Sequence, residues 1–310
     1  MSDTTRIAHD IKTQAQRLGF DACGFAVAQP VDAVAREQYR QWLAQGRQGC
    51  MAWAERYCDV RDNPQLLLDG ARTVIMLAMN YYPGQMQPQQ APQFAYYAYG
   101  RDYHEVMRER MRELAQFIVS ETGCDTRCCV DTAPLRERYW AQRAGLGFIG
   151  LNNQLILPGR GSYFFLGAVV TTLELPADEP CRLSCGECRA CIAACPGHAL
   201  GYDQPVDARR CLSCLTIEYR GELPQWARDV MGNRVYGCDE CQRCCPHNRH
   251  AQPTAIADFR PTEEFLSLTA ADIRHMTSAQ FKRMFGHSAV QRTRLQGLQR
   301  NLPIRTGDGE

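Results

Sequence analysis

The sequence lacks the long apolar segments that place a chain in a membrane. No apolar run reaches the roughly 18 residues that a spanning helix requires, and the segment 167–175 is too short. The first residues, MSDTTRIAHD, contain no apolar core of a secretory signal. We therefore expect a cytoplasmic protein with no membrane partner, in which the cysteines stay reduced.

Phosphate-binding motifs are missing as well. The pattern GxxxxGK[ST] does not occur, and Gly145, Gly147 and Gly150 match GxGxxG by letter only, because they follow an expected helix rather than a strand. We expect these glycines to mark turns where the backbone passes close to another segment.

The chain also lacks a strong excess of either charge. With 35 Lys and Arg against 34 Asp and Glu its net charge is +1, so no overall field attracts nucleic acid. The segment 273–305 is the exception, with seven Lys or Arg and no Asp or Glu. Such a segment can follow the phosphates of a nucleic acid, or it can be the solvated face of helices near the C-terminus.

Cysteine is abundant instead: there are 17, of which eleven lie between positions 181 and 245. Cys185 opens the pattern C-x2-C-x2-C-x3-C-P, the ligand spacing of bacterial ferredoxins with two [4Fe–4S] clusters. A second run opens at Cys238 and also ends in Cys-Pro. The fourth cysteine of such a run ligates the other cluster, so we expect the two runs to exchange ligands.

This exchange predicts two ligand sets. The first cluster is expected on Cys185, Cys188, Cys191 and Cys245. The second is expected on Cys195, Cys238, Cys241 and one further thiolate, with Cys211 favoured over Cys214. Structural zinc suits paired C-x2-C units but not a third cysteine followed by x3-C-P, and disulfides do not suit a reducing compartment.

The first 175 residues alternate between helical and strand patterns. Apolar spacing predicts helices over 4–18, 31–44, 105–120 and 135–144, and strands over 22–27, 73–82, 128–131 and parts of 154–175. A Pro-punctuated linker follows at 175–180. We expect a mixed fold of α/β or α+β class: a layered α/β domain over 1–175, a ferredoxin-like module with two [4Fe–4S] clusters over 176–250, and a basic helical tail over 251–310.

The large front domain argues against a plain electron carrier, which would need only the cysteine module. It indicates a substrate pocket and a second redox centre. The residues alone therefore lead to an iron–sulfur reductase whose other cofactor is unidentified.

Several motifs in combination take the interpretation further. They are Arg101-Asp-Tyr-His104, Val130-Asp131-Thr-Ala-Pro134-Leu-Arg-Glu137-Arg138, Gly147-Phe-Ile-Gly150, Gly161-Ser-Tyr-Phe-Phe-Leu-Gly167, Gly232-Asn-Arg-Val-Tyr-Gly-Cys238 and the two cysteine runs. Together they resemble the epoxyqueuosine reductase family, whose kin are the reductive dehalogenases, and the resemblance extends to about residue 300.

The resemblance implies an activity, cofactors and partners. It implies reduction of epoxyqueuosine to queuosine at the wobble position of tRNA, the last step of queuosine biosynthesis. The implied cofactors are two [4Fe–4S] clusters and base-off cobalamin in the front domain. The implied partners are a tRNA anticodon stem-loop, touched by the basic tail, and a low-potential donor of flavodoxin or ferredoxin type, and the enzyme is expected to be a monomer.

The resemblance also implies roles for single residues. It implies Cys211 as the remaining cluster ligand, and Asp131 as proton donor and cobalamin contact. Further corrin or substrate contacts are implied at Arg56, Gly161, Ser162, Ser213 and Arg220. His104 is expected to be a structural or hydrogen-bonding residue rather than a cobalt ligand, because Met107 stands where the motif of histidine-ligated cobalamin proteins requires Gly.

Asp131 needs a proton at neutral pH to act as a donor. We therefore expect burial beside a corrin face to raise its pKa. Without the resemblance, Asp before Thr-Ala-Pro would be read as a turn or cap residue. The chain departs from the family pattern at Leu151, where a polar residue often stands, and at His247, where Trp is usual.

Two other functions compete with this one. A small-molecule corrinoid reductase of dehalogenase type is disfavoured because such enzymes usually carry export signals. A non-catalytic electron-transfer protein would bind no corrinoid.

Overall fold

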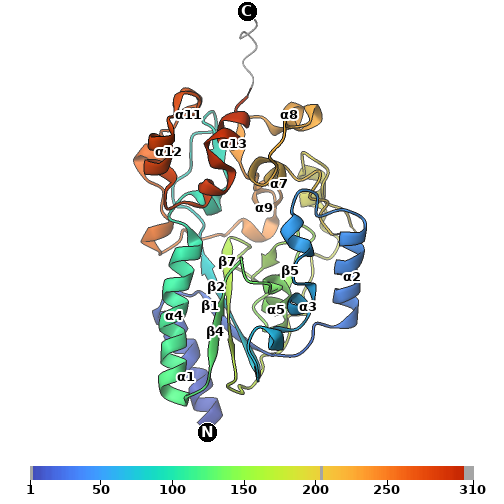
Figure 1. Ribbon diagram of the computed structural model, residues 1–310, viewed down its shortest axis with the longest axis vertical. Coiled ribbons are helices and arrows are strands. Elements are labelled where there is room, and N and C mark those ends of the chain that lie inside the picture. Colours follow the sequence, from blue (N-terminus) through green and yellow to red (C-terminus); the bar gives the residue numbers. More distant parts are fainter. Residues whose placement is uncertain (1–2, 203–204, 304–310) are drawn as a thin grey trace, which may run out of the picture.

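A four-stranded antiparallel sheet forms the centre of the lower lobe in the computed structural model, which describes residues 3–202 and 205–303 (Figure 1). The strands run in the order β1 (Ala22–Val27), β2 (Thr73–Asn80), β7 (Phe164–Thr171) and β4 (Thr126–Cys129). All residues of β2 except the last are buried. The continuous apolar run at 73–82 thus forms a strand covered on both faces, as predicted.

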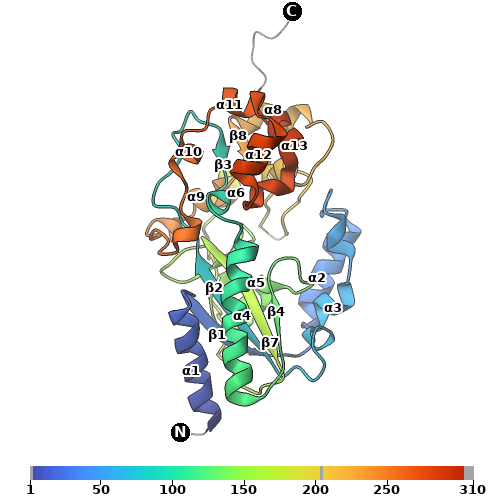
Figure 2. The same ribbon diagram turned by 60° about the vertical axis from the view of Figure 1, so that its left-hand side comes forward.

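Helices cover both faces of this sheet. On one face lie α1 (Asp3–Arg17) and α4 (Tyr103–Thr122), and Figure 2 shows them side by side along the strands. On the other face lies α5 (Glu137–Arg143), with α2 (Ala33–Ala44) and α3 (Cys58–Asp62) beyond it. Asp102 caps the start of α4 and accepts a hydrogen bond from the His104 N–H, and Gly123 caps its end in the left-handed conformation.

A short hairpin joins the sheet to the cysteine module. It consists of β5 (Phe148–Ile149) and β6 (Leu155–Ile156). A Cβ atom on Gly147 would lie 2.2 Å from the Ile156 carbonyl oxygen, and Gly145 has φ of +76°. These glycines therefore mark close backbone approaches, as expected from the sequence.

The upper lobe contains the cysteine module and the C-terminal helices. The module holds α6 (Ala190–Ala194), α7 (Leu212–Ile217), α8 (Gln225–Met231), β8 (Arg234–Tyr236) and α9 (Glu240–Arg243). The tail forms α10 (Glu263–Leu266), α11 (Ala270–His275), α12 (Ser278–Phe285) and α13 (Arg294–Arg300), so it is helical as predicted. Short 3-10 turns are η1 (Ala52–Glu55), η2 (Pro64–Leu66), η3 (Tyr96–Ala98), η4 (Pro246–Asn248), η5 (Ala257–Phe259) and η6 (Ala289–Thr293).

One segment of the front half crosses into the upper lobe. The strand β3 (Gln93–Phe94) pairs in parallel with β8, and the Phe94 ring stacks near Tyr236 and Phe285. The tail residues Phe265 and Leu298 belong to the same buried cluster as Ile11 of α1. The three expected parts thus share one core, which fixes the position of the cysteine module relative to the sheet.

The fold agrees with the expected class: a mixed α/β lobe, a cysteine module and a helical tail. Arg305, one of the seven basic residues counted in the tail, lies outside the described residues. No described helix is long and apolar enough to cross a membrane.

Candidate iron–sulfur centres and catalytic hollow

The first predicted thiol set converges on one small pocket. Its wall contains Cys185, Cys188, Cys191 and Cys245, together with Pro246 and His247. The Leu151 N–H points at the Cys185 sulfur, 3.4 Å away. Because a backbone group makes this contact, it does not depend on the unusual side chain at position 151.

The second set also lies together. Burial raises the pKa of the Cys241 thiol, and the nearby thiols of Cys211, Cys238 and Cys195 raise it further, so these four groups are close neighbours. The Ala199 N–H contacts the Cys195 sulfur at 3.3 Å. Cys211 stands at the start of α7, where the helix fixes its direction.

Cys214, the competing candidate, faces elsewhere. Its sulfur lies 3.5 Å from that of Cys50, in the segment that follows α2. Cys214 is therefore engaged with Cys50, whereas Cys211 is among the thiols that surround Cys241. This placement favours Cys211 as the fourth ligand of the second set.

The donor chemistry of both sets suits a cluster better than a single ion. Among the described residues, no group of three or more His, Cys, Asp or Glu side chains converges on a point where one metal ion would sit. Four thiolates on one zinc lie only about 3.8 Å apart, given the Zn–S bond of about 2.3 Å. A [4Fe–4S] cluster takes each thiolate on a different iron, so it accepts a wider spread of sulfur atoms.

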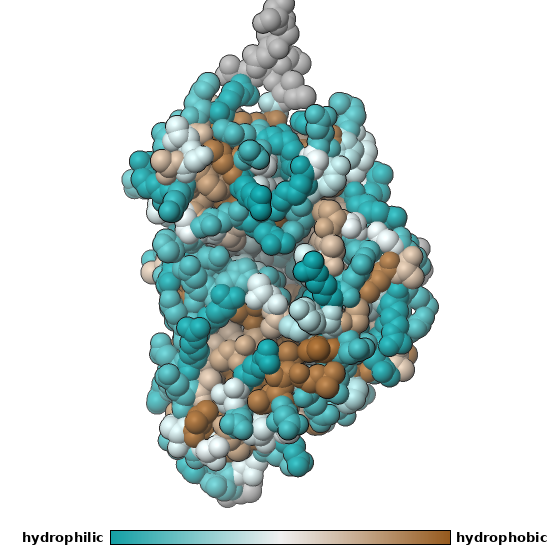
Figure 3. Space-filling model, viewed as in Figure 1, coloured by the Kyte–Doolittle hydropathy of each residue, from teal (hydrophilic) through white to brown (hydrophobic). Residues whose placement is uncertain are grey.

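Figure 3 shows a depression between the two lobes. We call the space that the exposed side chains of Asp131 and Arg138 line the hollow. The side chain of Asp131 is 54% exposed, yet burial by the surrounding protein is the largest influence on its pKa. Arg138 is likewise exposed, while burial lowers the pKa of its guanidinium. Side-chain exposure and a strong effect of burial on the pKa occur together when a side chain lines an open space that protein surrounds on most sides.

Three side chains form a chain of hydrogen bonds beside this hollow. His104 Nδ1 lies 2.7 Å from Asp102 Oδ1, and His104 Nε2 lies 3.0 Å from Asp131 Oδ2. Burial lowers the pKa of His104, but the two carboxylates outweigh it and raise the pKa to about 9. The imidazole is therefore protonated at neutral pH and donates from both nitrogens, in the hydrogen-bonding role expected for His104.

The pKa of Asp131 lies below its usual value, whereas the sequence reasoning expected burial beside a corrin face to raise it. Burial does raise it, as anticipated, but the hydrogen bond and charge of His104 outweigh burial and leave the pKa below its usual value. The proton therefore rests on His104, and Asp131 is the ionised partner. The sequence-based argument missed this because it considered burial without the neighbouring cation.

Glu137 is the carboxyl group that keeps a proton. Burial and the charge of Asp131 raise its pKa to about 8, and its Oε1 accepts a hydrogen bond of 2.7 Å from the Asp131 N–H. This bond holds Asp131 in a left-handed conformation with φ of +48°. The sequence reasoning did not single out Glu137, although it falls within the motif that contains Asp131.

The remaining predicted contacts are scattered. Ser162 is buried between Gln242 and Asn248, and a Cβ on Gly161 would meet Asn248, so both residues join the lobes. Ser213 lies on α7, and Arg56 is exposed at the end of η1.

Arg220 contacts Arg292, whose charge reaches Asp131. It donates to the carbonyl oxygen of Arg292 at 2.6 Å. Arg292 pairs with Glu218, and its charge helps to lower the pKa of Asp131. Glu218 follows α7 directly, so these contacts connect the second thiol set with the hollow.

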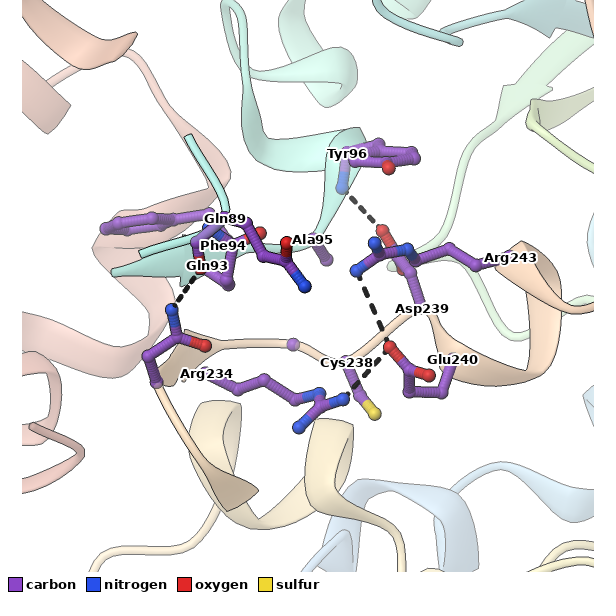
Figure 4. A pocket seen from close by; sticks show the side chains of 12 residues that line it. Gln89, Gln93, Phe94, Ala95, Tyr96, Arg234, Cys238, Asp239, Glu240 and Arg243 are labelled. Atoms are coloured by element: carbon purple, nitrogen blue, oxygen red, sulfur yellow. Dashed lines mark hydrogen bonds and ion pairs between the residues drawn. The ribbon is translucent and has the colours of Figure 1, made fainter. Parts of the chain in front are cut away.

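A separate polar cavity of about 300 Å³ opens beside Cys238 (Figure 4). Arg234 and Arg243 extend into it, and both pair with Glu240, at 2.9 and 3.5 Å. Burial raises the pKa of Asp239, on the same wall, to about 6.

Comparisons with known proteins give a consistent result. Residues 61–132 match the family model "Epoxyqueuosine reductase QueG, DUF1730", and residues 184–248 match "4Fe-4S double cluster binding domain". The chain is 39% identical to epoxyqueuosine reductase of Cellulophaga algicola, over 94% of this chain and 95% of that one. It is 40% identical to the Vibrio cholerae enzyme, over 99% of this chain and 84% of that one.

Solved structures agree. A crystal structure of selenomethionine-labelled epoxyqueuosine reductase matches with a TM-score of 0.90 and 30% identity, over 96% of this chain and 80% of that one. A second, with an epoxyqueuosine-modified tRNA-Tyr stem loop, matches with a TM-score of 0.87 at 30% identity and the same coverage. A reductive dehalogenase at 17% identity, TM-score 0.50, shares the fold.

The two thiol sets match a double [4Fe–4S] module, and an α/β lobe packs beside it. This combination identifies the class of protein as an iron–sulfur oxidoreductase. The identity to curated relatives over nearly the whole chain makes the family specific. The chain belongs to the epoxyqueuosine reductase family.

Proposed function

We propose that this protein reduces epoxyqueuosine in tRNA to queuosine. The observation that carries the proposal is the hydrogen-bonded Asp102–His104–Asp131 array, which places a proton at the edge of the hollow. Its support from relatives is the structure of epoxyqueuosine reductase with an epoxyqueuosine-modified stem loop.

The reaction sets two requirements. An epoxide C–O bond must break and both carbons must end as an alkene, which takes two electrons and two protons and releases water. Side chains cannot provide the electrons, so redox cofactors are needed. Side chains can provide the protons.

The hollow holds two protons at neutral pH. One is on His104, with a pKa of about 9, and the other is on Glu137, with a pKa of about 8. We propose that Asp131 passes the His104 proton to the opening epoxide oxygen. Exclusion of water around Asp131 would strengthen the effect of burial, raise the pKa of its carboxyl and draw the shared proton toward it.

The side chains at the hollow can meet the polar groups of a bound cofactor. The walls of the hollow combine an exposed carboxylate and guanidinium with enclosure by the surrounding protein, and Figure 3 shows hydrophobic side chains gathered on the lower lobe below it. When bound there, cobalamin supplies reducing power that no side chain has. Arg138 and Asp131 would face it. Cobalt ligation by His104 is disfavoured, because both of its nitrogens bind carboxylates.

The cluster ligands follow from the two thiol sets. We propose Cys185, Cys188, Cys191 and Cys245 for one cluster and Cys195, Cys211, Cys238 and Cys241 for the other. The parts 1–175, 176–250 and 251–310 then serve cobalamin binding, electron supply and tRNA contact. One chain provides all eight thiols and the walls of the hollow, so we propose a monomer that takes electrons from a flavodoxin or ferredoxin.

The decisive experiment uses anaerobic protein loaded with iron–sulfur clusters and cobalamin. A stem loop carrying epoxyqueuosine is incubated with excess reductant, digested to nucleosides and analysed by mass spectrometry. We expect queuosine to replace epoxyqueuosine. No queuosine from protein shown by iron content and absorption to hold all cofactors would refute the proposal.

A further inference from the structure

The two thiol sets differ in their exposure at the surface. The second set includes Cys211 at the start of α7, and Glu218 at the end of α7 pairs with Arg292 near Asp131. All four thiols of this set are partly covered. In the first set Cys188 is exposed. A donor at the surface can therefore approach the first set more closely than the second.

The surface around Cys188 is an exposed loop, which we call the entry loop and define as residues 182–189. Arg182, Leu183, Gly186 and Glu187 are exposed in it, and Leu183 keeps 56% of its surface in solvent. A side chain added at Gly186 would meet nothing within 4 Å. A partner can therefore approach the loop without displacing other parts of the chain.

Arg189 holds the entry loop in shape. Its guanidinium donates to the carbonyl oxygens of Gly186 and Cys188 at 2.9 and 2.8 Å. It also lies 3.9 Å from the centre of the Tyr202 ring, which is itself 57% exposed. The loop is thus braced before any partner arrives, and preorganised contacts cost less to form.

The composition of the entry loop indicates the kind of partner. It presents two arginines against one glutamate, and the exposed apolar groups Leu183 and Tyr202 lie in or beside it. Small electron-transfer complexes bury little surface and use opposite charge to speed association. An acidic redox protein fits this surface.

A second place where a thiol nears the surface is the polar cavity beside Cys238. There Arg234 and Arg243 are already paired with Glu240 inside the cavity (Figure 4). The cavity wall carries two carboxyl groups, Asp239 and Glu240, against these two arginines, so it attracts an acidic partner less than the entry loop does. The cavity is the rival entry point.

We infer that an acidic one-electron carrier docks on the entry loop and reduces the first cluster there. This rests on the proposed function for the presence of the clusters. The donor gives one electron to the cluster at each encounter, so two encounters supply the two electrons of one turnover.

The test measures electron transfer without tRNA or cobalamin. Cluster-loaded protein is mixed anaerobically with fully reduced flavodoxin in a stopped-flow instrument, and the second-order rate constant is followed by absorbance at several salt concentrations. We expect the rate to fall with salt. Arg182→Glu should lower it about tenfold at low salt, with the difference vanishing at high salt.

Controls separate docking from general effects. Arg112→Glu, an exposed site on α4 in the lower lobe, changes the net charge equally and should leave the rate near that of the unaltered protein. Reduction by dithionite and iron content should be the same in all variants. Leu183→Ser should slow the reaction with little change in its salt dependence.

Two results would overturn the inference. One is an Arg182→Glu rate equal to that of Arg112→Glu. The other is a selective loss with Arg243→Glu, which would place the donor at the cavity. Because the assay contains no tRNA, its result is independent of whether the protein forms queuosine.

Discussion

The raised pKa of His104 can be tested by changing Asp102. This residue contacts His104 on the side away from Asp131 and the hollow. Asp102 is the carboxylate on the far side of the imidazole, 2.7 Å from Nδ1. Asp102→Asn removes its charge but keeps the shape, and Asn is an equally good cap for the first turn of α4. The substitution therefore isolates electrostatics from folding.

The size of the effect follows from the structure. Two carboxylates, working against burial, raise the pKa of His104 from 6.5 to about 9. Removing one of two comparable partners should lower the pKa by at least half of this, about 1.2 units or roughly 1.7 kcal/mol. At pH 8 the protonated fraction should fall from about nine tenths to about four tenths.

The assay has a spectroscopic and a kinetic part. NMR of protein labelled with 15N-histidine follows the titration, with His104→Gln used to assign the signal. Single-turnover formation of queuosine is measured from pH 6 to 10 in parallel. The raised pKa means that the proton is present at low pH and lost as pH rises through about 9, so activity should fall on the alkaline side.

Asp102→Asn should move this alkaline fall to lower pH by the same amount as the NMR titration. An unchanged His104 titration in Asp102→Asn would refute the electrostatic reasoning. A titration that moves while the kinetic profile stays fixed would show that His104 is not the proton source.

The other predictions concern the cofactors and the fold. Asp131→Asn should abolish queuosine formation and leave both clusters in place. Iron analysis and the absorption spectrum check that the clusters remain. Cys188→Ala should lower iron from about eight to about four atoms per chain. Cys211→Ala should do the same, whereas Cys214→Ala should keep all the iron, and the opposite pattern would reverse the ligand assignment. Gly147→Ala should destabilise the protein by about 1–3 kcal/mol in thermal unfolding, because its Cβ would meet a backbone oxygen.

Local residue patterns were enough to predict the longer elements of the front domain and the chemistry of the thiols. Strand β2 is recognisable because a strand covered on both faces needs an unbroken apolar run. The cysteine spacing is equally local, since three thiolates two residues apart are arranged by one turn of chain. For this reason the first ligand set could be predicted from the spacing alone, together with the rule that the fourth cysteine of each run ligates the other cluster.

Tertiary structure decided which groups act on one another. His104 and Asp131 are 27 residues apart and meet at 3.0 Å only because α4 packs against the end of β4. That contact lowers the pKa of Asp131, and burial together with the charge of Asp131 raises the pKa of Glu137. The pairing of β3 with β8 and the common core of front domain and tail were also beyond the sequence pattern. The spacing of residues along the chain indicates metal ligands and secondary structure. The pKa of a side chain depends on its burial and on neighbouring charges, which only the folded chain brings together.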